Sequence, residues 1–322
     1  MDFSLNELQT VLADSIGKFL DNEYDFDTRQ SHADSERGFS DEVWSTFAEL
    51  GWTAVPFAEE DGGIGGGAVD MMVLMQSLAR GLVVEPYLAN VVLAGGALAR
   101  AANDAQKERW LHPIIAGEMH ATLAFNEPQS RYDIASIATK ATPGGNAWSL
   151  NGRKGVVLNG GTADLIVVPA RTAGDVTDRD GITLFAVPAD SAGITRNDYT
   201  TVDGLRAAEI ELQGVRVPAD HVLGEVGGGF AVLDATIDDA TLAVCAEAVG
   251  IMHVLKDKTV EYAKQRQQFG VPIGTFQALQ HRMVDMLMAC EKAQSVLIWA
   301  VMTRAEGGDD VKHAVSSIKY LV

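Results

Sequence analysis

The residues whose types and spacing most suit ligand binding in this chain lie in the stretch 261–280. Arg266 is followed three residues later by Phe269 and Gly270, and Pro272 comes soon after. This order predicts the end of one helix, a tight corner and the start of the next helix. An arginine at such a corner presents a planar fork of donors that never deprotonates, which suits an anionic group. The same pattern also fits an ordinary helix corner, which needs glycine and proline only to turn.

A second candidate is Glu247, a lone carboxylate inside the apolar run 242–249. Burial would raise its pKa, which suits a general base. A carboxylate at a subunit contact or at the edge of the core explains the same pattern, and we favour that interpretation. The seven histidines show no metal-ligand spacing, so we expect no metal site.

Composition limits the partners of this 322-residue chain, which is 47% hydrophobic and carries a formal net charge of −19. An acidic surface argues against nucleic acid and against anionic membranes, because both repel it. Cys245 and Cys290 show no paired spacing, which favours a reduced compartment. With no basic leader and no long apolar run, we expect a cytoplasmic protein without a membrane span.

The periodicity of the apolar residues divides the chain into three parts. Residues 1–118 have helical spacing, with a capping box predicted at Ser4 and Glu7 and another helix start at Ser40. From residue 119 to 225 the period changes to two, and 226–322 returns to long helices near 230–265, 276–306 and from about 309. The fold class expected is α+β and multidomain: a helical domain, a β-barrel or sandwich, and a C-terminal helical bundle. The strands expected are 121–125, 137–142, 148–158, 164–170, 182–187 and 208–217, with a hairpin turn at 143–146.

Several motifs, in this order, resemble those of the acyl-CoA dehydrogenase family of flavoproteins, and the resemblance covers nearly all of the chain. It predicts the same helical, β and helical-bundle order. The first motif is the glycine-rich loop at 61–65, and the second comprises Glu127-Pro128, Asp133 and residues 137–140. The third comprises residues 150–154 and 159–164, and the fourth comprises 204–206, 215–218 and 222–224. The last is the corner at 266–280, with Arg-x-x-Phe-Gly followed by Phe-Gln-x-x-Gln.

The resemblance implies FAD-dependent α,β-dehydrogenation of an acyl-CoA thioester. A carboxylate removes the α-proton, the flavin takes the β-hydride, and electron-transfer flavoprotein is the implied acceptor. It also implies that Arg266 reaches the pyrophosphate of FAD held by a neighbouring subunit. Gln268, Phe269 and Gln277 are the further cofactor-binding residues implied at this corner.

The flavin-binding positions of this chain depart from the family pattern. Asn126 stands where Thr or Ser usually contacts the flavin ring, and it can still donate and accept. Arg131 and Tyr132 replace a small Gly-Ser pair, and Val156 and Leu158 replace an aromatic residue and a hydroxyl. Either this branch tolerates apolar substitutes and binds its own FAD, or the subunit has lost its own flavin face. We favour the second interpretation.

The catalytic base is not identified in the sequence. In most of the family it lies in a segment beyond Val322, and in a minority it lies at the position matching Ala240, which cannot act. Asp238 matches an aspartate that contacts the pantetheine arm of the substrate. We therefore interpret the chain as one subunit of a heteromeric acyl-CoA dehydrogenase, paired with a second, similar subunit. The alternatives are a self-sufficient homotetrameric enzyme and a non-catalytic structural partner.

Overall fold

The computed structural model describes residues 5–322. The first helix, α1 (Glu7–Glu23), begins at Asn6, whose side chain accepts the N–H of Gln9 while the Gln9 side chain accepts the N–H of Asn6. This is a capping box. Of the capping box predicted at Ser4 and Glu7, Ser4 lies outside the described residues.

The other N-terminal helices follow the predicted order. Ser40 caps α3, accepting the N–H of Val43, and Gly51 ends that helix with a positive φ of 75°. The helical region from 104 to 115 contains two short α-helical segments around a π-helix, a rare form that often marks a local irregularity. The elements are α2 (Phe26–Ala33), α3 (Asp41–Glu49), η1 (Trp52–Ala54), η2 (Glu59–Asp61), α4 (Ala68–Leu78), η3 (Ala79–Gly81), the π-helix η4 (Leu88–Gly95), α5 (Gly96–Ala101), α6 (Asp104–Gln106), the π-helix η5 (Lys107–Leu111) and α7 (His112–Ile115).

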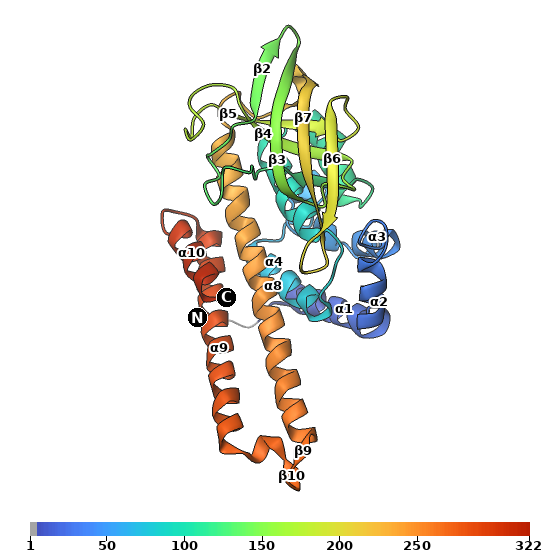
Figure 1. Cartoon of the computed structure of the whole chain (residues 1–322), viewed down its shortest axis with the longest axis vertical. Helices are drawn as coiled ribbons and strands as arrows, with labels where there is room; N and C mark the ends of the chain where they lie inside the picture. Colours follow the sequence, from blue (N-terminus) through green and yellow to red (C-terminus); the bar gives the residue numbers. More distant parts are fainter. Residues whose placement is uncertain (1–4) are drawn as a thin grey trace. The chain divides into compact units, whose positions relative to one another are not determined.

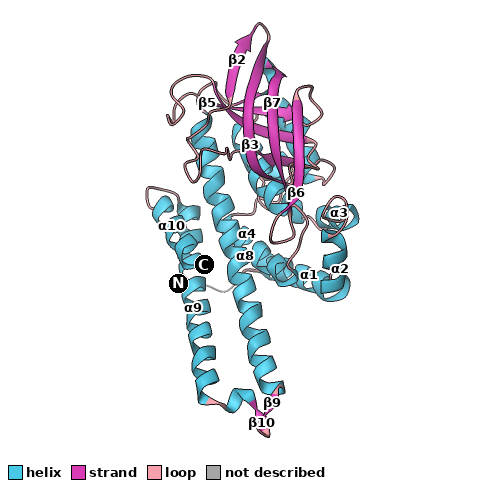
Figure 2. Cartoon of the chain, in the orientation of Figure 1, coloured by secondary structure: helices cyan, strands magenta, loops and turns pink. Residues whose placement is uncertain are grey.

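The middle of the chain forms one mixed sheet, with strand order β6-β7-β3-β2-β4-β5-β8 and β1 beside β4 (Figure 2). Its core is apolar, and Leu150, Ile166 and Phe185 are fully buried in it. The turn predicted at 143–146 does join two antiparallel strands. The strands are β1 (Ala121–Leu123), β2 (Lys140–Gly144), β3 (Ala147–Leu158), β4 (Leu165–Arg171), β5 (Ile182–Pro188), β6 (Ile194–Thr200), β7 (Arg206–Pro218) and β8 (Val222–Leu223), with η6 (Ala219–His221) before β8.

Two strand predictions were wrong. The strand expected at 137–142 begins only at Lys140, because the preceding residues are held as a loop by polar contacts described below. β6 was missed because its residues are mostly polar and only partly buried; it pairs along one side only, with β7. An edge strand of this kind carries a weak alternating pattern.

The C-terminal helices match the predicted bounds to within two residues. The long helix α8 (Gly229–Gln265) is followed by a short two-stranded hairpin and by α9, and the hairpin lies at the joined end of the two helices (Figure 1). The elements after α8 are β9 (Gln267–Gln268), β10 (Val271–Pro272), the 3-10 helix η7 (Ile273–Thr275), α9 (Gln277–Glu306) and α10 (Val311–Leu321). No helix within residues 5–322 is long and apolar enough to cross a membrane.

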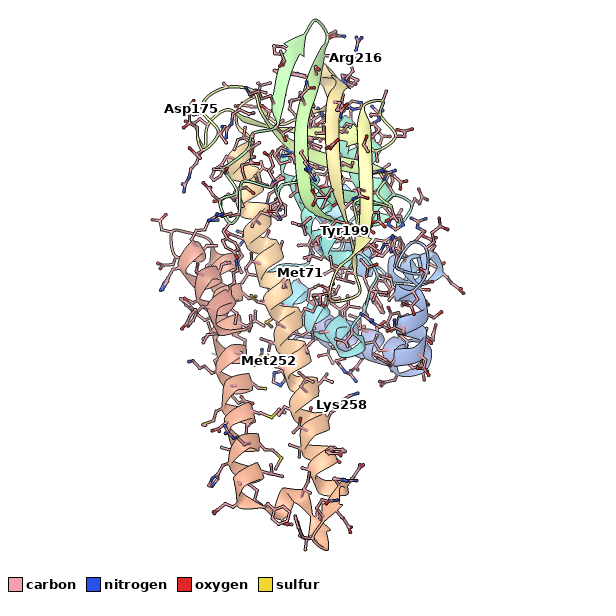
Figure 3. All side chains as sticks on the ribbon, in the orientation of Figure 1. Met71, Asp175, Tyr199, Arg216, Met252 and Lys258 are labelled. Carbon is pink, nitrogen blue, oxygen red and sulfur yellow. The ribbon has the colours of Figure 1, made fainter. Side chains whose placement is uncertain are left out.

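By spatial contact the chain forms two compact units. One combines the N-terminal residues up to Arg29 with Gly67–Val83 and Thr241–Val322, and the other combines Gln30–Gly66 with Val84–Ala240. In the first unit, α4 contacts α9 through a hydrogen bond from Gln76 to Gln294 of 2.7 Å. The Met252 carbonyl (Figure 3) accepts from the Cys290 thiol at 3.6 Å, which joins α8 to α9. This division groups segments distant in sequence, so the boundaries 1–118, 119–225 and 226–322 stay a prediction.

Candidate functional site

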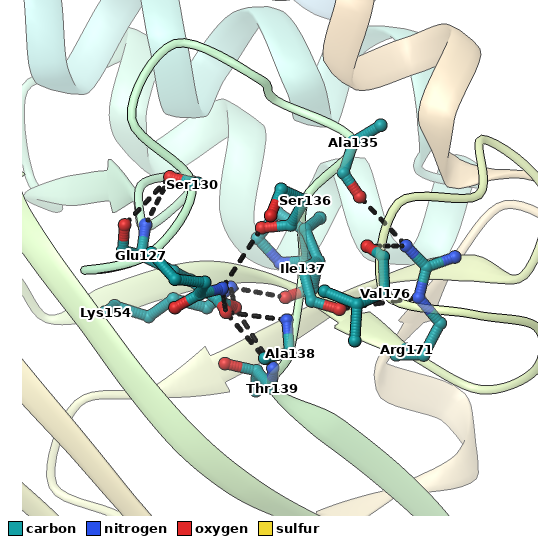
Figure 4. A network of polar contacts seen from close by, with 12 residues as sticks. Glu127, Ser130, Ala135, Ser136, Ile137, Ala138, Thr139, Lys154, Arg171 and Val176 are labelled. Carbon is teal, nitrogen blue, oxygen red and sulfur yellow. Dashed lines mark hydrogen bonds and ion pairs between the residues drawn. The ribbon is translucent and has the colours of Figure 1, made fainter.

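A buried ion pair lies beneath the loop that leaves β1. The Lys154 ammonium of β3 is fully buried and lies 2.7 Å from Glu127 Oε1 and 2.7 Å from the Pro169 carbonyl of β4. The Glu127 carboxylate also accepts the backbone N–H of Ala138 at 2.7 Å and of Thr139 at 3.2 Å (Figure 4). A buried charge needs this many partners to offset its lost hydration. The pair therefore binds four chain segments at one point.

The charge of this pair is stabilised mainly by its own partners. Burial by itself would raise the pKa of Glu127, but the Lys154 charge and the donors of Lys154, Thr139 and Gln129 lower it below its ordinary value. Burial lowers the pKa of Lys154, and Glu127 opposes that shift. The carboxylate is thus a poor proton acceptor, so we assign it to structure and not to catalysis.

Arg171 forms a second polar hub next to the first (Figure 4). Its guanidinium is buried and donates to backbone carbonyls of two loops, at 2.8 to 3.4 Å. It thereby holds the loop before β2 against the loop between β4 and β5, which is why residues 137–139 do not extend the strand. The accepting carbonyls belong to Ala135, Ile137, Val176, Asp178 and Asp180.

A β-bulge follows Lys154 directly. The pairing of β3 with β7 shifts between Lys154 and Val157, so Gly155 and Val156 face a single partner, Glu209. Val156 has a φ of +49° and is 49% exposed. A β-branched residue with positive φ is strained by about 1–3 kcal/mol and persists only where its surroundings impose it.

Contacts from both sides impose this bulge. The N–H of Gly155 donates to the Asn126 carbonyl at 3.0 Å, and the N–H of Val156 lies 3.4 Å from Glu209 Oε1. Tyr199 (Figure 3) also contacts the Val156 backbone, and burial together with the Glu209 charge raises its pKa. The backbone of Asn126 is therefore hydrogen-bonded to the bulge that carries Val156.

The loop after Glu127 presents two large side chains to solvent. Arg131 has a φ of +49°, a conformation that favours glycine, and Tyr132 is 95% exposed. The backbone bend expected of a glycine is thus retained, but an arginine adopts it. Both side chains are exposed, so this loop differs from the small Gly-Ser pair in size as well as in chemistry.

The predicted corner lies at the end of α8 and is a true hairpin. Val271 pairs with Gln268, which leaves Phe269 and Gly270 as a two-residue loop with φ values of +55° and +80°. Positive φ at both positions is typical of a type I′ turn, which prefers Asn-Gly, so Phe269 is strained there. Phe269 is also 93% exposed. Arg266 is exposed beside it, and no residue in the range 5–322 forms an ion pair with its guanidinium.

The carboxylates of α8 differ in their surroundings. Asp239 is paired with Arg100 in a close contact, so it is unsuited to act as a free base. Asp238 is buried and Ala240 is buried next to it, while Glu247 is only half-buried. The apolar, buried setting that would favour a base at Glu247 is therefore incomplete.

The predicted residues fall into separate groups. Arg266, Gln268, Phe269 and Gln277 lie together around the hairpin, and all four are exposed. Asn126 lies in the loop after β1, which belongs to the other compact unit. The sequence analysis did not predict the Glu127–Lys154 pair or the Arg171 hub. Both ion-pair residues lie in motifs noted there, but their pairing joins positions 27 residues apart. No cluster of three His, Cys, Asp or Glu side chains suited to a metal occurs in the described part of the chain.

Three family models match the chain in sequence order. "Acyl-CoA dehydrogenase, N-terminal domain" matches residues 6–118, the middle-domain model matches 122–215 and the C-terminal-domain model matches 227–322. The chain belongs to the acyl-CoA dehydrogenase family. It therefore belongs to a family of flavoprotein oxidoreductases, and the helical, sheet-rich and helical order expected for this family is confirmed.

Individual relatives agree with this assignment. A short-chain specific acyl-CoA dehydrogenase from Megasphaera elsdenii is 31% identical over 324 residues, covering 95% of this chain and 82% of that protein. The solved structure "PigA with FAD and proline" has a TM-score of 0.91 and 26% identity, covering all of this chain and 86% of that one. The ChsE4-ChsE5 complex from Mycobacterium tuberculosis has a TM-score of 0.89 and 26% identity, covering all of this chain and 84% of that one.

Proposed function

We propose that this chain is a subunit of an acyl-CoA dehydrogenase that uses FAD to dehydrogenate an acyl-CoA thioester. The observation that carries this proposal is the hairpin after α8. It places an exposed arginine, Arg266, beside a strained and exposed aromatic residue, Phe269. Strain retained at an exposed position suggests a functional role, because nothing in the core of the protein requires it.

The hairpin residues fit the anionic part of FAD. The guanidinium of Arg266 suits the pyrophosphate, since its fork donates two parallel hydrogen bonds to oxyanions. Gln268, Phe269 and Gln277 are exposed nearby and supply amide groups and an aromatic ring for the rest of the cofactor. When bound, FAD accepts the β-hydride, while this chain's own residues bind and orient it.

The sheet surface fits the flavin ring only in part. Its backbone bulge is in place and Asn126 offers an amide, but Val156 and Leu158 offer no hydroxyl or aromatic ring. A flavin ring relies on hydrogen bonds for its orientation, so this surface is a weak site. We infer that the FAD touched by Arg266 is held mainly by a second, complete subunit.

A second observation favours a partner subunit. Long apolar side chains remain exposed along α8 and α9, including Leu255 at 55%, Val284 at 51% and Met288 at 57%. Exposed apolar surface of this extent is typical of a protein interface. The relative ChsE4-ChsE5 is named as a complex of two chains, which supports the same arrangement here.

Other parts of the proposal rest on the family resemblance. We assign Asp238 to the pantetheine arm of the substrate and electron-transfer flavoprotein to the role of acceptor. The three-part division at residues 118 and 225 is supported by the segments that the family models match. A cytoplasmic location is supported by the two free cysteines, Cys245 and Cys290.

We also propose that the α-proton base comes from the partner subunit. Ala240 cannot act, Asp239 is paired with Arg100, and Glu247 is only half-buried. Losing a true general base costs on the order of 10²–10⁴ in rate. Glu247→Gln in the FAD-containing complex is therefore expected to keep turnover within a few-fold of wild type. A collapse of turnover with normal FAD content would instead identify Glu247 as the base and favour a self-sufficient enzyme.

The proposal as a whole is tested by Arg266→Ala in the complex purified with its partner. A charge-assisted contact is worth about 1.5–3 kcal/mol, so FAD retention on dialysis should fall at least tenfold. Arg216→Ala is the matched control, because Arg216 is an exposed arginine on β7, remote in sequence from the hairpin (Figure 3). Unchanged FAD content in Arg266→Ala would contradict the proposal and favour a non-catalytic structural role.

A further inference from the structure

The hairpin corner is tied to α9 by one side chain. Gln280 lies in the first turn of α9, and its Nε2 donates to the Gly274 carbonyl in η7 at 3.0 Å. This bond reaches back across six residues, so it fixes the corner and not only the helix start. The sequence motif Phe-Gln-x-x-Gln contains Gln280, but the resemblance gives it no role.

Gly274 in turn lies against the last turns of α8. A Cβ atom at position 274 would be 3.0 Å from the Ala263 carbonyl oxygen and 3.3 Å from its carbon. Ala263 is buried, and it precedes Arg266 by three residues. This is tighter than almost all observed Cβ contacts, so a side chain at position 274 would require the α8 backbone or η7 to shift by a few tenths of an ångström.

A backbone bond completes the connection to Arg266. The N–H of Ile273, the residue before Gly274, donates to the Arg266 carbonyl at 2.8 Å. Residues 273 and 274 therefore hold both the carbonyl of Arg266 and the helical turn before it. Gln280 holds residue 274 from the other side, so a continuous set of contacts runs from α9 to Arg266.

We propose that Gln280 is a positioning residue for Arg266. This inference rests on the proposed function, in which Arg266 binds the FAD pyrophosphate. The exposed Arg266 side chain has no ion pair within residues 5–322, so its placement depends on its backbone. A long flexible side chain loses substantial entropy when it is ordered, and a fixed backbone reduces that loss.

A double-mutant cycle in the assembled, FAD-containing complex tests this. The dissociation constant for FAD is measured for wild type, Gln280→Ala, Arg266→Ala and the double variant. Loss of one hydrogen bond predicts a roughly three- to tenfold weaker FAD binding for Gln280→Ala. In the Arg266→Ala background the same change should have no further effect, because a residue acting through Arg266 has nothing left to position. Equal losses in both backgrounds would overturn the inference, since they indicate a general structural role.

Two further variants separate positioning from folding. Gln280→Lys keeps a donor of similar reach and is expected to restore most of the FAD affinity. Gly274→Ala forces η7 away from Ala263 and is expected to mimic Gln280→Ala. Gln213→Ala, an exposed glutamine on β7, is the control and should leave FAD binding unchanged. If Gly274→Ala does not weaken FAD binding, or Gln280→Lys does not restore it, these contacts do not position Arg266.

The outcomes also separate this inference from the proposed function. If Arg266→Ala leaves the FAD dissociation constant unchanged, the proposed function itself fails, and the inference fails with it. If Arg266→Ala weakens FAD binding and Gln280→Ala does not, only the inference fails.

Discussion

At the scale of single residues, the Glu127–Lys154 pair is the most consequential feature. Two full charges lie in the core beside the strained bulge, and they hold Asn126 and Gly155 through their immediate neighbours. Replacing both members of a buried pair by apolar groups is often tolerated, but removing one member is not, because an uncompensated charge remains. Loss of either side chain alone is therefore expected to disturb the geometry of the sheet surface.

Lys154→Met is expected to destabilise the protein by about 3–5 kcal/mol at neutral pH, because it leaves Glu127 buried without its cation. Urea denaturation measures this loss. The double variant Glu127→Gln with Lys154→Met is the control, and its loss should be clearly smaller. An equal loss in both variants would show that packing at position 154, and not charge, is decisive.

The effect of Lys154→Met should also depend on pH in a defined direction. In the wild type the pKa of Glu127 is lowered, so its contribution is present above the unfolded pKa and is lost as pH falls through the folded pKa. In the variant, burial without Lys154 raises that pKa, so protonation at acid pH relieves the buried charge. The stability difference between the two proteins should therefore shrink as the pH falls below neutral. A difference independent of pH would contradict this account.

At the scale of elements, the hairpin between α8 and α9 combines strain with exposure. Its two-residue turn prefers Asn-Gly, yet it carries Phe269 before Gly270. The phenyl ring of Phe269 meets Phe276 edge-on, with ring centroids 6.2 Å apart, which offsets part of the strain. The hairpin thus carries a projecting aromatic group beside Arg266 at the expense of local stability.

Phe269→Asn is expected to stabilise the hairpin by about 1 kcal/mol, because asparagine adopts positive φ more readily. Hydrogen exchange at the Val271 amide in the paired strand measures this gain. FAD retention in the complex should fall at the same time, since the aromatic contact is lost. Gly270→Ala is a control with the opposite expected effect, and it should weaken the protection of the Val271 amide from hydrogen exchange. A variant with a stabler hairpin and full FAD retention would remove Phe269 from the cofactor site.

At the scale of the whole molecule, the chain combines a preserved family fold with several expected flavin-binding positions whose residues depart from the family pattern. All three family models match, and the sheet retains the bulge and its buried supports. Among the altered residues, Arg131, Tyr132 and Val156 are exposed, whereas Asn126 and Leu158 are half-buried. This combination supports our proposal that the chain completes the flavin site of another subunit.

Expression of this chain alone is therefore expected to yield protein with little or no FAD, and co-expression with its partner should yield a flavin-containing assembly. The visible absorption spectrum of the purified protein, set against protein concentration, measures this. A yellow homo-oligomer with one FAD per chain would instead show that Val156 and Leu158 are adequate substitutes, and that the enzyme is self-sufficient.

The sequence by itself determined those features that depend on neighbours along the chain. The helices predicted near 230–265 and 276–306, the turn at 143–146 and the corner at Phe269 and Gly270 follow from local periodicity and from residues with special backbone preferences, and the two helices differ from their observed bounds by one residue. The sequence also shows an alanine at position 240, which the family resemblance matches to the base position of some members.

The tertiary structure alone decided which distant groups meet. Lys154 pairs with Glu127 across 27 residues, and Arg171 gathers carbonyls from two loops, contacts that no local pattern encodes. The same holds for the missed strand β6, whose polar residues form a strand only because β7 pairs with them. The strain at Val156 likewise comes from the bulge opposite Glu209 and not from valine's own preference, which opposes it. Hydrogen bonds and ion pairs between residues distant in sequence form only once folding has closed the loops between those residues.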